Sequence, residues 1–117
     1  MFINFSNHPS KKWGEQQLRE AQRFGEVKDL PFPNVQPEWS SEEVNRLADE
    51  YAEILTKMGG ENCTVHIMGE MTFTHAVVSR LKEQGIVCVA STTKRCAYET
   101  ADGKKVSTFR FVQFRRY

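Results

Sequence analysis

The amino-acid sequence predicts an α/β protein, a three-layer sandwich built on one mostly parallel β-sheet. Short apolar segments alternate with longer segments of helical periodicity, in the order β-α-β-α-β-α-β. This alternation is typical of parallel strands joined by right-handed crossovers, with helices on both faces of the sheet. An Asp-Gly pair between two further strand-like segments indicates a C-terminal antiparallel β-hairpin. With strands numbered in chain order, we expect a sheet order of about 2-1-3-4, extended by the hairpin beyond strand 4.

The N-terminal part of the chain begins with an expected strand over residues 2–6 and a helix over about 11–24. Ser10 can cap the first turn of this helix, and Gly25 is suited to end it. A short strand over 27–30 follows. It stops at a Pro-Phe-Pro segment, because proline cannot continue a β-ladder.

The middle of the chain carries the clearest helical pattern. Ser40 or Ser41 can cap a helix whose apolar residues recur every three or four positions until Gly59-Gly60. A strand over 63–68 follows, and then a helix from about 72 to 84. These segments supply the third strand and the crossover to the fourth.

The C-terminal part predicts the fourth strand and the hairpin. Residues 86–91 form the most apolar segment, as expected of a strand covered on both faces, and the Thr-Thr-Lys-Arg segment at 92–95 is expected to end it. Near the C-terminus, Phe109 and Phe111 alternate with Arg110. One face of the last strand should therefore be apolar and the other cationic.

The composition indicates a single globular domain over residues 1–117. Hydrophobic residues make up 39% and charged residues 26% of the chain, which is too apolar for a disordered protein. No apolar segment approaches the ~20 residues of a membrane-spanning helix. Asn4 and Ser6 interrupt the N-terminal segment where a signal peptide would be apolar. We therefore expect a cytoplasmic protein without a membrane partner.

The cysteines and histidines show no metal-ligand spacing. Cys63, Cys88 and Cys96 lack a Cys-x-x-Cys pattern and are expected to be reduced, partly buried thiols. The three histidines form no recognisable metal motif with them. The sequence therefore predicts no metal site and no cofactor.

The net charge of +1 hides an uneven distribution. Residues 1–93 have an excess of four acidic side chains, whereas residues 94–117 have an excess of five basic ones. A solvated hairpin surface explains any single lysine. A basic segment attached to an acidic body is also what an anionic partner would prefer.

Polar residues follow three strands at the same expected edge of the sheet. In parallel sheets, ligands bind outside the carboxyl ends of the strands, where successive connections leave in opposite directions. In this chain that point lies between the first and third strands. The predicted site residues are Ser6, Asn7 and His8, then Gly69, Glu70 and Thr72, and finally Thr92, Thr93, Lys94 and Arg95.

These residue types suit a phosphate or nucleotide ligand. Hydroxyls and free amides at helix N-termini donate to phosphate oxygens, and Gly69 would let the backbone approach closely. Lys94 and Arg95 would supply positive charge, and Glu70 can bind a ribose hydroxyl. No P-loop or Gly-x-Gly-x-x-Gly motif is present, which disfavours a standard nucleoside triphosphate or dinucleotide site.

Structural roles compete with ligand roles at several of these positions. Ser6 and Asn7 can form only a turn and cap the first helix, and Glu70 can favour a helix start through the dipole. His66 lies in mid-strand and is most simply a core or half-buried histidine. His8, at a strand end before a proline, is the histidine that packing explains least.

The N-terminal segment Ile-Asn-Phe-Ser-Asn-His-Pro resembles the start of small CRISPR-associated proteins of the CARF-like group. In that group the first strand ends in an Asn-Phe-Ser-His-Pro corner. The matching residues here are Asn4, Phe5, Ser6, His8 and Pro9, with Asn7 as an additional residue. The segment GEMTFTHAVVSRLKEQGIVCVASTTKR is similar to the second half of such a domain in its order of strand end, helix and strand.

The resemblance implies a Rossmann-like homodimer that binds a cyclic oligoadenylate second messenger of type III CRISPR antiviral defence. Some members of the group cleave this messenger as ring nucleases, and others only bind it. Cleavage by attack of the messenger's own 2′-hydroxyl needs no metal, because the protein aligns the nucleophile and stabilises charge. His8, Lys94 and Arg95 are the catalytic candidates, and the other predicted site residues would contact phosphate or ribose.

Two further hypotheses remain open. The basic hairpin can make the protein a nucleic-acid-binding or regulatory module, with Arg110, Arg115 and Arg116 on phosphates and exposed phenylalanines or Tyr117 stacking on bases. The protein can also be a small interaction protein whose polar edge is structural only.

Overall fold

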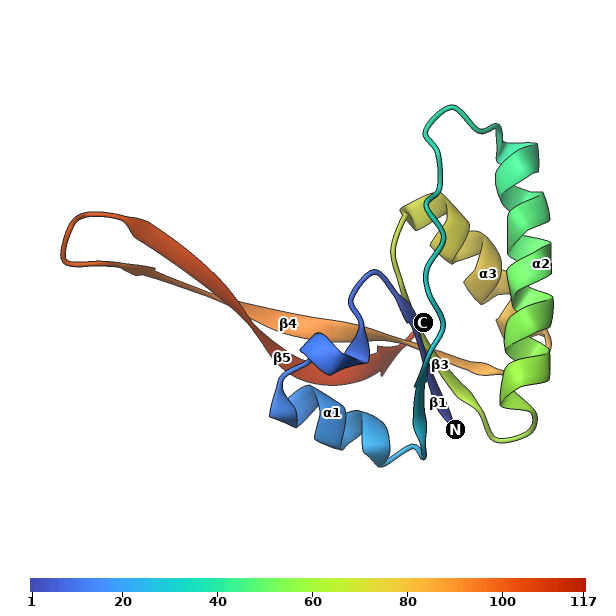
Figure 1. Cartoon of the computed structure of the whole chain (residues 1–117), viewed down its shortest axis with the longest axis horizontal. Coiled ribbons are helices and arrows are strands. Elements are labelled where there is room, and N and C mark those ends of the chain that lie inside the picture. Colours follow the sequence, from blue (N-terminus) through green and yellow to red (C-terminus); the bar gives the residue numbers. More distant parts are fainter.

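A computed structural model describes all 117 residues and confirms the α/β fold with its C-terminal hairpin (Figure 1). The elements are β1 (Phe2–Ser6), the 3₁₀ helix η1 (Ser10–Lys12), α1 (Glu15–Gln22), β2 (Val27–Asp29), α2 (Ser41–Gly59), β3 (Thr64–Met68), α3 (Met71–Glu83), β4 (Val87–Glu99) and β5 (Lys105–Arg116). They form one sheet in the order β2-β1-β3-β4-β5. The first four strands are parallel, and β5 is antiparallel to β4. The expected strand order is therefore confirmed.

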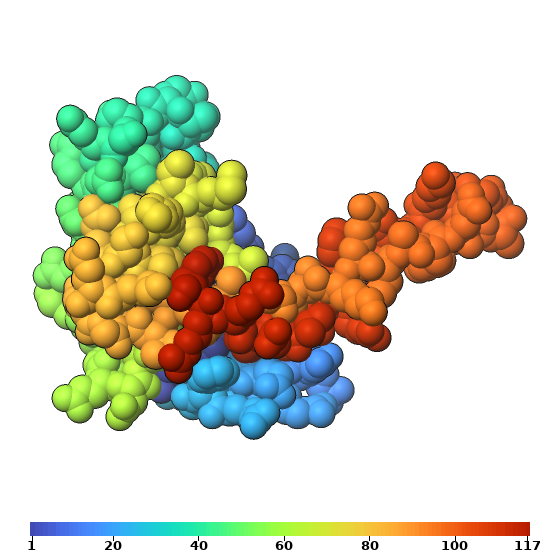
Figure 2. All heavy atoms as spheres, turned by 180° about the vertical axis from the view of Figure 1, so that it is seen from behind, coloured from blue at the N-terminus to red at the C-terminus, as the bar shows by residue number.

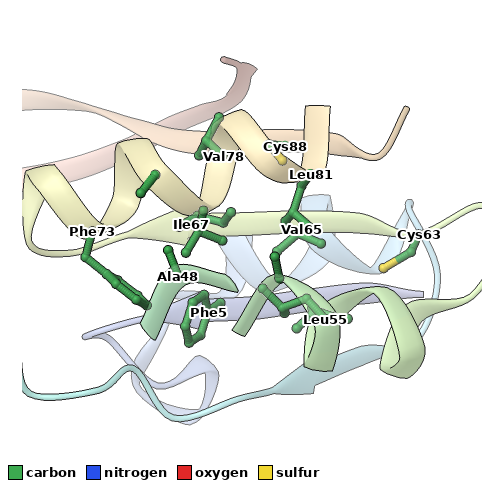
Figure 3. Close-up of a cluster of buried hydrophobic side chains, with 14 of the residues drawn as sticks. Phe5, Ala48, Leu55, Cys63, Val65, Ile67, Phe73, Val78, Leu81 and Cys88 are labelled. Atoms are coloured by element: carbon green, nitrogen blue, oxygen red, sulfur yellow. The ribbon is translucent and has the colours of Figure 1, made fainter. Parts of the chain in front are cut away.

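Two clusters of apolar side chains lie on opposite faces of the sheet. Because successive strand residues point to opposite faces, Ile3 and Phe5 enter the larger cluster with α2 and α3, while Phe2 packs with Trp13 and with Ala21 of α1. Figure 3 shows the larger cluster between the sheet and the two helices. Burying each large apolar side chain contributes about 1.5–3 kcal/mol. Helices therefore cover both faces, as a three-layer sandwich requires.

The helix expected over residues 11–24 is divided into two elements. Trp13 and Gly14 have extended backbone conformations between η1 and α1, so a continuous helix cannot form there. Ser10 does not cap α1 as expected, since its Oγ donates to Oδ2 of Asp29 at 2.9 Å. The break has a packing reason, because it allows the Trp13 side chain to reach the buried cluster on the sheet.

The start and end of α2 agree with the sequence. Ser40 is the N-cap residue, and its Oγ accepts a hydrogen bond from the backbone N of Glu43 at 3.2 Å. Gly60 follows the helix at a φ of +61°, in the left-handed region that favours glycine. None of the helices combines the length and the hydropathy needed to cross a membrane.

The fourth strand extends much farther than expected. The prediction that Thr92 to Arg95 end the strand is wrong, because β4 continues to Glu99 in an antiparallel ladder with β5. Pairing with β5 satisfies the backbone, and the β-branched side chains of Thr92 and Thr93 suit a strand. The hairpin at Asp102-Gly103 is confirmed, and Gly103 takes a φ of +84° in the turn.

The outer part of the hairpin, residues 94–110, projects from the body of the protein and is called the arm below (Figures 1 and 2). The longest dimension of the molecule, 51 Å, runs along it. Tyr98 and Phe109 on the arm are 55% and 69% exposed. At its base the register shifts between Thr92 and Thr93, and Val112 of β5 is left without a partner, which makes a β-bulge.

The turn from β3 into α3 depends on Gly69. A Cβ atom at this residue would lie 2.2 Å from Cζ of Phe32. The Phe32 ring packs against Phe5 and Phe73, at centroid distances of 5.0 and 5.3 Å, and cannot move freely. Packing of Phe32 therefore explains the glycine without a ligand.

We expect Gly69→Ala to lower the free energy of unfolding by about 1–3 kcal/mol, because the new methyl group overpacks the contact with the Phe32 ring. Gly14→Ala is the matched control, since a Cβ there meets nothing within 4 Å. Urea unfolding of both variants measures the difference. Equal free energies of unfolding for the two variants would show that the Phe32 ring moves aside without a loss of stability.

Candidate functional site

An open pocket of about 470 Å³ lies at the carboxyl ends of β1 and β3, on the α1 side of the sheet. The loop after β1 and the side of α1 form part of its wall, and the base of the arm forms another part. The lining residues are Ser6, Asn7, His8, Trp13, Gln17, His66, Met68, Gly69, Ser91, Thr93, Phe109 and Phe111. The pocket thus lies at the sheet edge where the sequence placed a ligand site.

The pocket gathers half of the predicted site residues. Ser6, Asn7, His8, Gly69 and Thr93 line it. The other five predicted residues lie outside it, for two different local reasons: helix capping after β3 and strand alternation along β4.

Glu70 and Thr72 belong to the N-terminal cap of α3. The Glu70 carboxylate accepts hydrogen bonds from the backbone N of Thr72 at 2.5 Å and of Phe73 at 3.4 Å, and from the Thr72 hydroxyl. The hydrogen bond from the Thr72 side chain, with those from the backbone of Thr72 and Phe73, lowers the pKa of Glu70, although burial acts in the opposite direction. This geometry corresponds to the structural alternative, in which Glu70 favours the helix start.

Thr92, Lys94 and Arg95 lie on a strand and not in a loop. The Thr92 hydroxyl donates to the carbonyl of Gln113 at 3.2 Å, on the face of β4 away from the pocket. Lys94 pairs with Arg110 on that same face. Arg95 shares the face of Thr93, but its guanidinium donates to Oγ of Ser107 at 3.1 Å, farther out on the arm.

The corner after β1 is held by internal hydrogen bonds. Oγ of Ser6 donates to Oδ1 of Asn4 at 2.7 Å and accepts from the backbone N of His8 at 3.2 Å. Nδ2 of Asn4 and Nε1 of Trp13 both donate to the carbonyl of His8, at 2.9 and 3.1 Å. Ser6 therefore shapes the turn, while the exposed side chains of Asn7 and His8 stand at the pocket.

A hydrogen-bonded chain forms the floor of the pocket, with Asn4 and His66 buried at its centre. Asn4 donates through Nδ2 to Oδ1 of Asp29 at 2.9 Å, and its Oδ1 lies 2.9 Å from Nδ1 of His66. Nε2 of His66 lies 2.9 Å from Oγ of Ser91. The chain thus runs Asp29–Asn4–His66–Ser91 across β2, β1, β3 and β4, and we call it the polar chain.

The partners in the polar chain determine the tautomer of His66. An amide oxygen only accepts hydrogen bonds, so Nδ1 of His66 must carry the proton that is donated to Asn4. In the neutral ring Nε2 then has a free lone pair, which accepts the hydroxyl proton of Ser91. His66 is therefore a neutral ring that accepts from Ser91.

The surroundings of His66 keep it neutral. Burial lowers the pKa of His66 to about 4, and the charge of His8 contributes in the same direction. The side chain is 2% exposed, and its ring stacks on Phe2 at 6.1 Å while Trp13 and Phe114 present their rings at 5.5 and 5.4 Å. The core role expected for His66 is confirmed, but the residue also lines the pocket.

Sequence reasoning missed the aromatic and inner polar parts of the pocket. The residues missed are Gln17, His66, Met68, Ser91, Phe109 and Phe111. Strand alternation held a usable signal, because Asn4 and Ser6 on one strand and His66 on the next are polar residues within otherwise apolar segments. The structure pairs Asn4 directly with His66 in the β1–β3 ladder.

A larger hollow of about 590 Å³ lies between α2 and α3, on the other face of the sheet, with Trp39, Met71 and His75 among its lining residues. It gathers no strand ends and none of the polar chain. No group of three or more His, Cys, Asp or Glu side chains lies together in the structure as a metal site would require. The pocket at the carboxyl edge is therefore the candidate functional site.

We expect the protein to lose stability as the pH falls from 6.5 to 4. In this range the unfolded chain protonates His66, with its ordinary pKa of 6.5, whereas the folded protein keeps the ring neutral until about pH 4. Protons therefore favour the unfolded state, and the loss attributable to His66 is about 3 kcal/mol, since each pKa unit corresponds to about 1.4 kcal/mol. Above pH 6.5 this contribution is constant.

Urea unfolding of the wild type and of His66→Gln between pH 4 and 7 isolates the contribution of His66. Carboxylates titrate alike in both proteins, so the stability difference between them should shrink on acidification. Parallel curves would contradict a neutral, buried His66.

Comparison with known proteins gives one family. The model of the family described as the uncharacterized protein MJ1673 family matches residues 1–115. No curated protein and no solved structure matches the chain. Because the family match extends over nearly the whole length, this chain belongs to the uncharacterized protein MJ1673 family.

Proposed function

We propose that the protein binds a cyclic oligoadenylate second messenger in the pocket at the carboxyl edge, as a cytoplasmic homodimer acting in type III CRISPR antiviral defence. The proposal includes cleavage of the messenger without a metal, as in ring nucleases. It rests on the resemblance of the N-terminal corner to CARF-like proteins and on the chemistry of the pocket.

The single observation that carries the proposal is the mixed lining of the pocket. Hydroxyls of Ser91 and Thr93 and the exposed side chain of His8 supply partners for ribose and phosphate, and Phe109 and Phe111 supply flat apolar surface for a base. A volume of about 470 Å³ falls within the range of small-molecule sites. This combination suits a nucleotide better than a purely ionic or purely apolar ligand.

The corner that carries the resemblance also lies at this pocket. Ser6 and His8 line it, and Asn4 lies beneath as part of the polar chain. The additional residue, Asn7, is exposed and lines the pocket without interrupting the hydrogen bonds of the turn. The resemblance and the pocket thus involve the same residues.

The lack of cationic side chains in the pocket of a single chain supports a homodimer. No lysine or arginine lines the pocket, although an oligoadenylate carries a negative charge at each phosphate. The arm holds five lysine and arginine side chains against two carboxylates, and its outer part projects away from its own body. An arm from a second copy can supply the missing cations.

The arm itself also favours a partner. An isolated two-stranded ribbon is marginally stable in water, and this one exposes Tyr98 and Phe109. The acidic balance of residues 1–93 complements the basic balance of the C-terminal segment. A second copy of the chain provides both an apolar cover and opposite charge.

A second candidate function is binding of single-stranded nucleic acid by the arm. The observation that favours it is the pairing of Lys94 with Arg110 on one face of the arm, where Tyr98 lies four residues farther out along β4. Such a surface would combine phosphate contacts with stacking. Its affinity would fall steeply with salt, because phosphate contacts release counterions.

We expect purified protein to bind labelled cyclic tetra- or hexa-adenylate in EDTA with micromolar or tighter affinity. Phe109→Ala should raise Kd roughly 5- to 150-fold, because loss of one base-stacking contact costs about 1–3 kcal/mol. Trp39→Ala is the matched control, since it removes a part-exposed aromatic ring far from the pocket. Fluorescence anisotropy gives both constants.

Competition with single-stranded RNA separates the two candidate functions. Failure to bind either ring would contradict the first function, and tight, salt-sensitive binding of the RNA alone would support the second.

We expect the arm to be required for the dimer. Replacing residues 97–107 by Asn-Gly joins Cys96 to Thr108, which are direct partners in the ladder, through a two-residue hairpin turn. This variant should sediment as a folded monomer and bind the ring weakly. Ala101→Ser in the existing turn is the control. A shortened variant that still dimerises would place the interface elsewhere.

A further inference from the structure

The polar chain ends inside the pocket at Ser91. The hydroxyl of Ser91 has one proton, and Nε2 of His66 is the stronger of its two acceptors, since the other is Sδ of Met68 at 3.0 Å. With its proton donated inward, Oγ of Ser91 has lone pairs left to accept a hydrogen bond. Ser91 therefore presents an acceptor to a ligand hydroxyl.

The rest of the polar chain holds His66 in this orientation. Nδ2 of Asn4 is committed to the Asp29 carboxylate and to the carbonyl of His8, so its Oδ1 must face His66. The aromatic rings of Phe2 and Trp13 restrict rotation of the imidazole. A hydroxyl, an imidazole and a side-chain oxygen in series are the arrangement by which enzymes activate a hydroxyl.

We propose that Ser91 is a catalytic residue of this pocket, which accepts the proton of a ribose 2′-hydroxyl while its own proton passes to Nε2 of His66. His66 acts through Ser91 and is a positioning residue. This inference rests on the proposed function, and it names the groups that would turn a messenger-binding site into a cleaving one.

The reaction is an internal transesterification of the ring. The 2′-oxygen forms a bond to the adjacent phosphorus as it loses its proton to Ser91, and the bond from phosphorus to the 5′-oxygen breaks. Water at the open mouth of the pocket protonates the leaving 5′-oxygen and becomes hydroxide, which then takes the extra proton of His66 through Ser91 to form water again. The products are a 2′,3′-cyclic phosphate and a 5′-hydroxyl, so the ring becomes linear.

Burial of His66 sets the conditions for this transfer. The low pKa of His66 ensures that Nε2 is unprotonated at neutral pH and ready to accept. A bound phosphate beside the pocket floor would favour the imidazolium form, because an opposite charge nearby stabilises it. Beyond His66 the polar chain ends in the exposed carboxylate of Asp29, which accepts a hydrogen bond from Nδ2 of Asn4.

Binding and cleavage of labelled cyclic tetra- and hexa-adenylate, measured in EDTA, test Ser91 directly. Ser91→Ala should raise Kd by no more than about tenfold, as expected for one lost hydrogen bond. At saturating ring it should lower the single-turnover cleavage rate by at least about 100-fold, the usual scale of general-base catalysis. Ser91→Thr, which retains the hydroxyl, should recover part of the rate. Ser79→Ala is the matched control, because its hydroxyl lies on α3 and bonds the carbonyl of His75.

The pH profile tests whether His66 acts through Ser91. The groups around the ring are His8 after β1 and Asp29 behind Asn4, and β4 and β5 present the uncharged Ser91 and Phe114. Wild type should cleave at a rate nearly independent of pH between 6 and 8. His66→Gln should be slow at pH 6 and gain rate with pH, because hydroxide replaces the lost acceptor.

The outcomes separate this inference from the proposed function. If wild type binds a ring but does not cleave it, or if folded Ser91→Ala cleaves within threefold of wild type, the inference is overturned and the binding function stands. If the pH–rate profile of His66→Gln runs parallel to that of wild type, His66 has only a structural role and the proposed proton transfer from Ser91 to His66 is overturned. If wild type binds neither ring, the proposed function fails first and this inference with it.

Discussion

The hydrogen bond between Asn4 and His66, 2.9 Å long and closed to solvent, is the constraint on which the pocket depends. Each residue places a polar group in the middle of a buried strand, and an unpaired buried group costs about 1–3 kcal/mol. Only the observed β1–β3 register brings the two side chains opposite each other. The register is therefore specified by polar matching as well as by apolar packing.

The same register also determines the composition of the pocket floor. With Asn4 opposite His66, the next residue on that face of β1 is Ser6, and β4 brings Ser91 to the other side of the imidazole. Every atom in the series has one possible hydrogen-bonding role once the Asp29 contact is made. The β1–β3 register thus determines both the stability of the sheet and the orientation of the polar groups at the pocket floor.

The sequence predicted the order of the sheet because hydrophobic periodicity and turn residues are local signals. It did not predict the length of β4, because the partner that extends this strand is β5, on the far side of a hairpin turn. For the same reason Lys94 and Arg95 were assigned to a loop at the sheet edge. Glu70 could have been assigned correctly, since its capping role was one of the two readings that the sequence allowed. The place of His66 in the pocket could be predicted only from the pairing of the strands, which the spacing of residues along the sequence does not give.

The β-bulge at Val112 gives the two faces of the hairpin their different chemistry. Phe111 and Phe114 are three positions apart, and in a regular strand they would point to opposite sides, yet their rings lie 4.9 Å apart. The unpaired residue between them restores the match, so that Phe109 and Phe111 face the pocket and Arg110 faces away. Which face of the arm is aromatic therefore depends on the number of residues in β5. An insertion or deletion of two residues would leave the phenylalanines on the pocket side, whereas an insertion or deletion of one residue would exchange the aromatic and cationic faces.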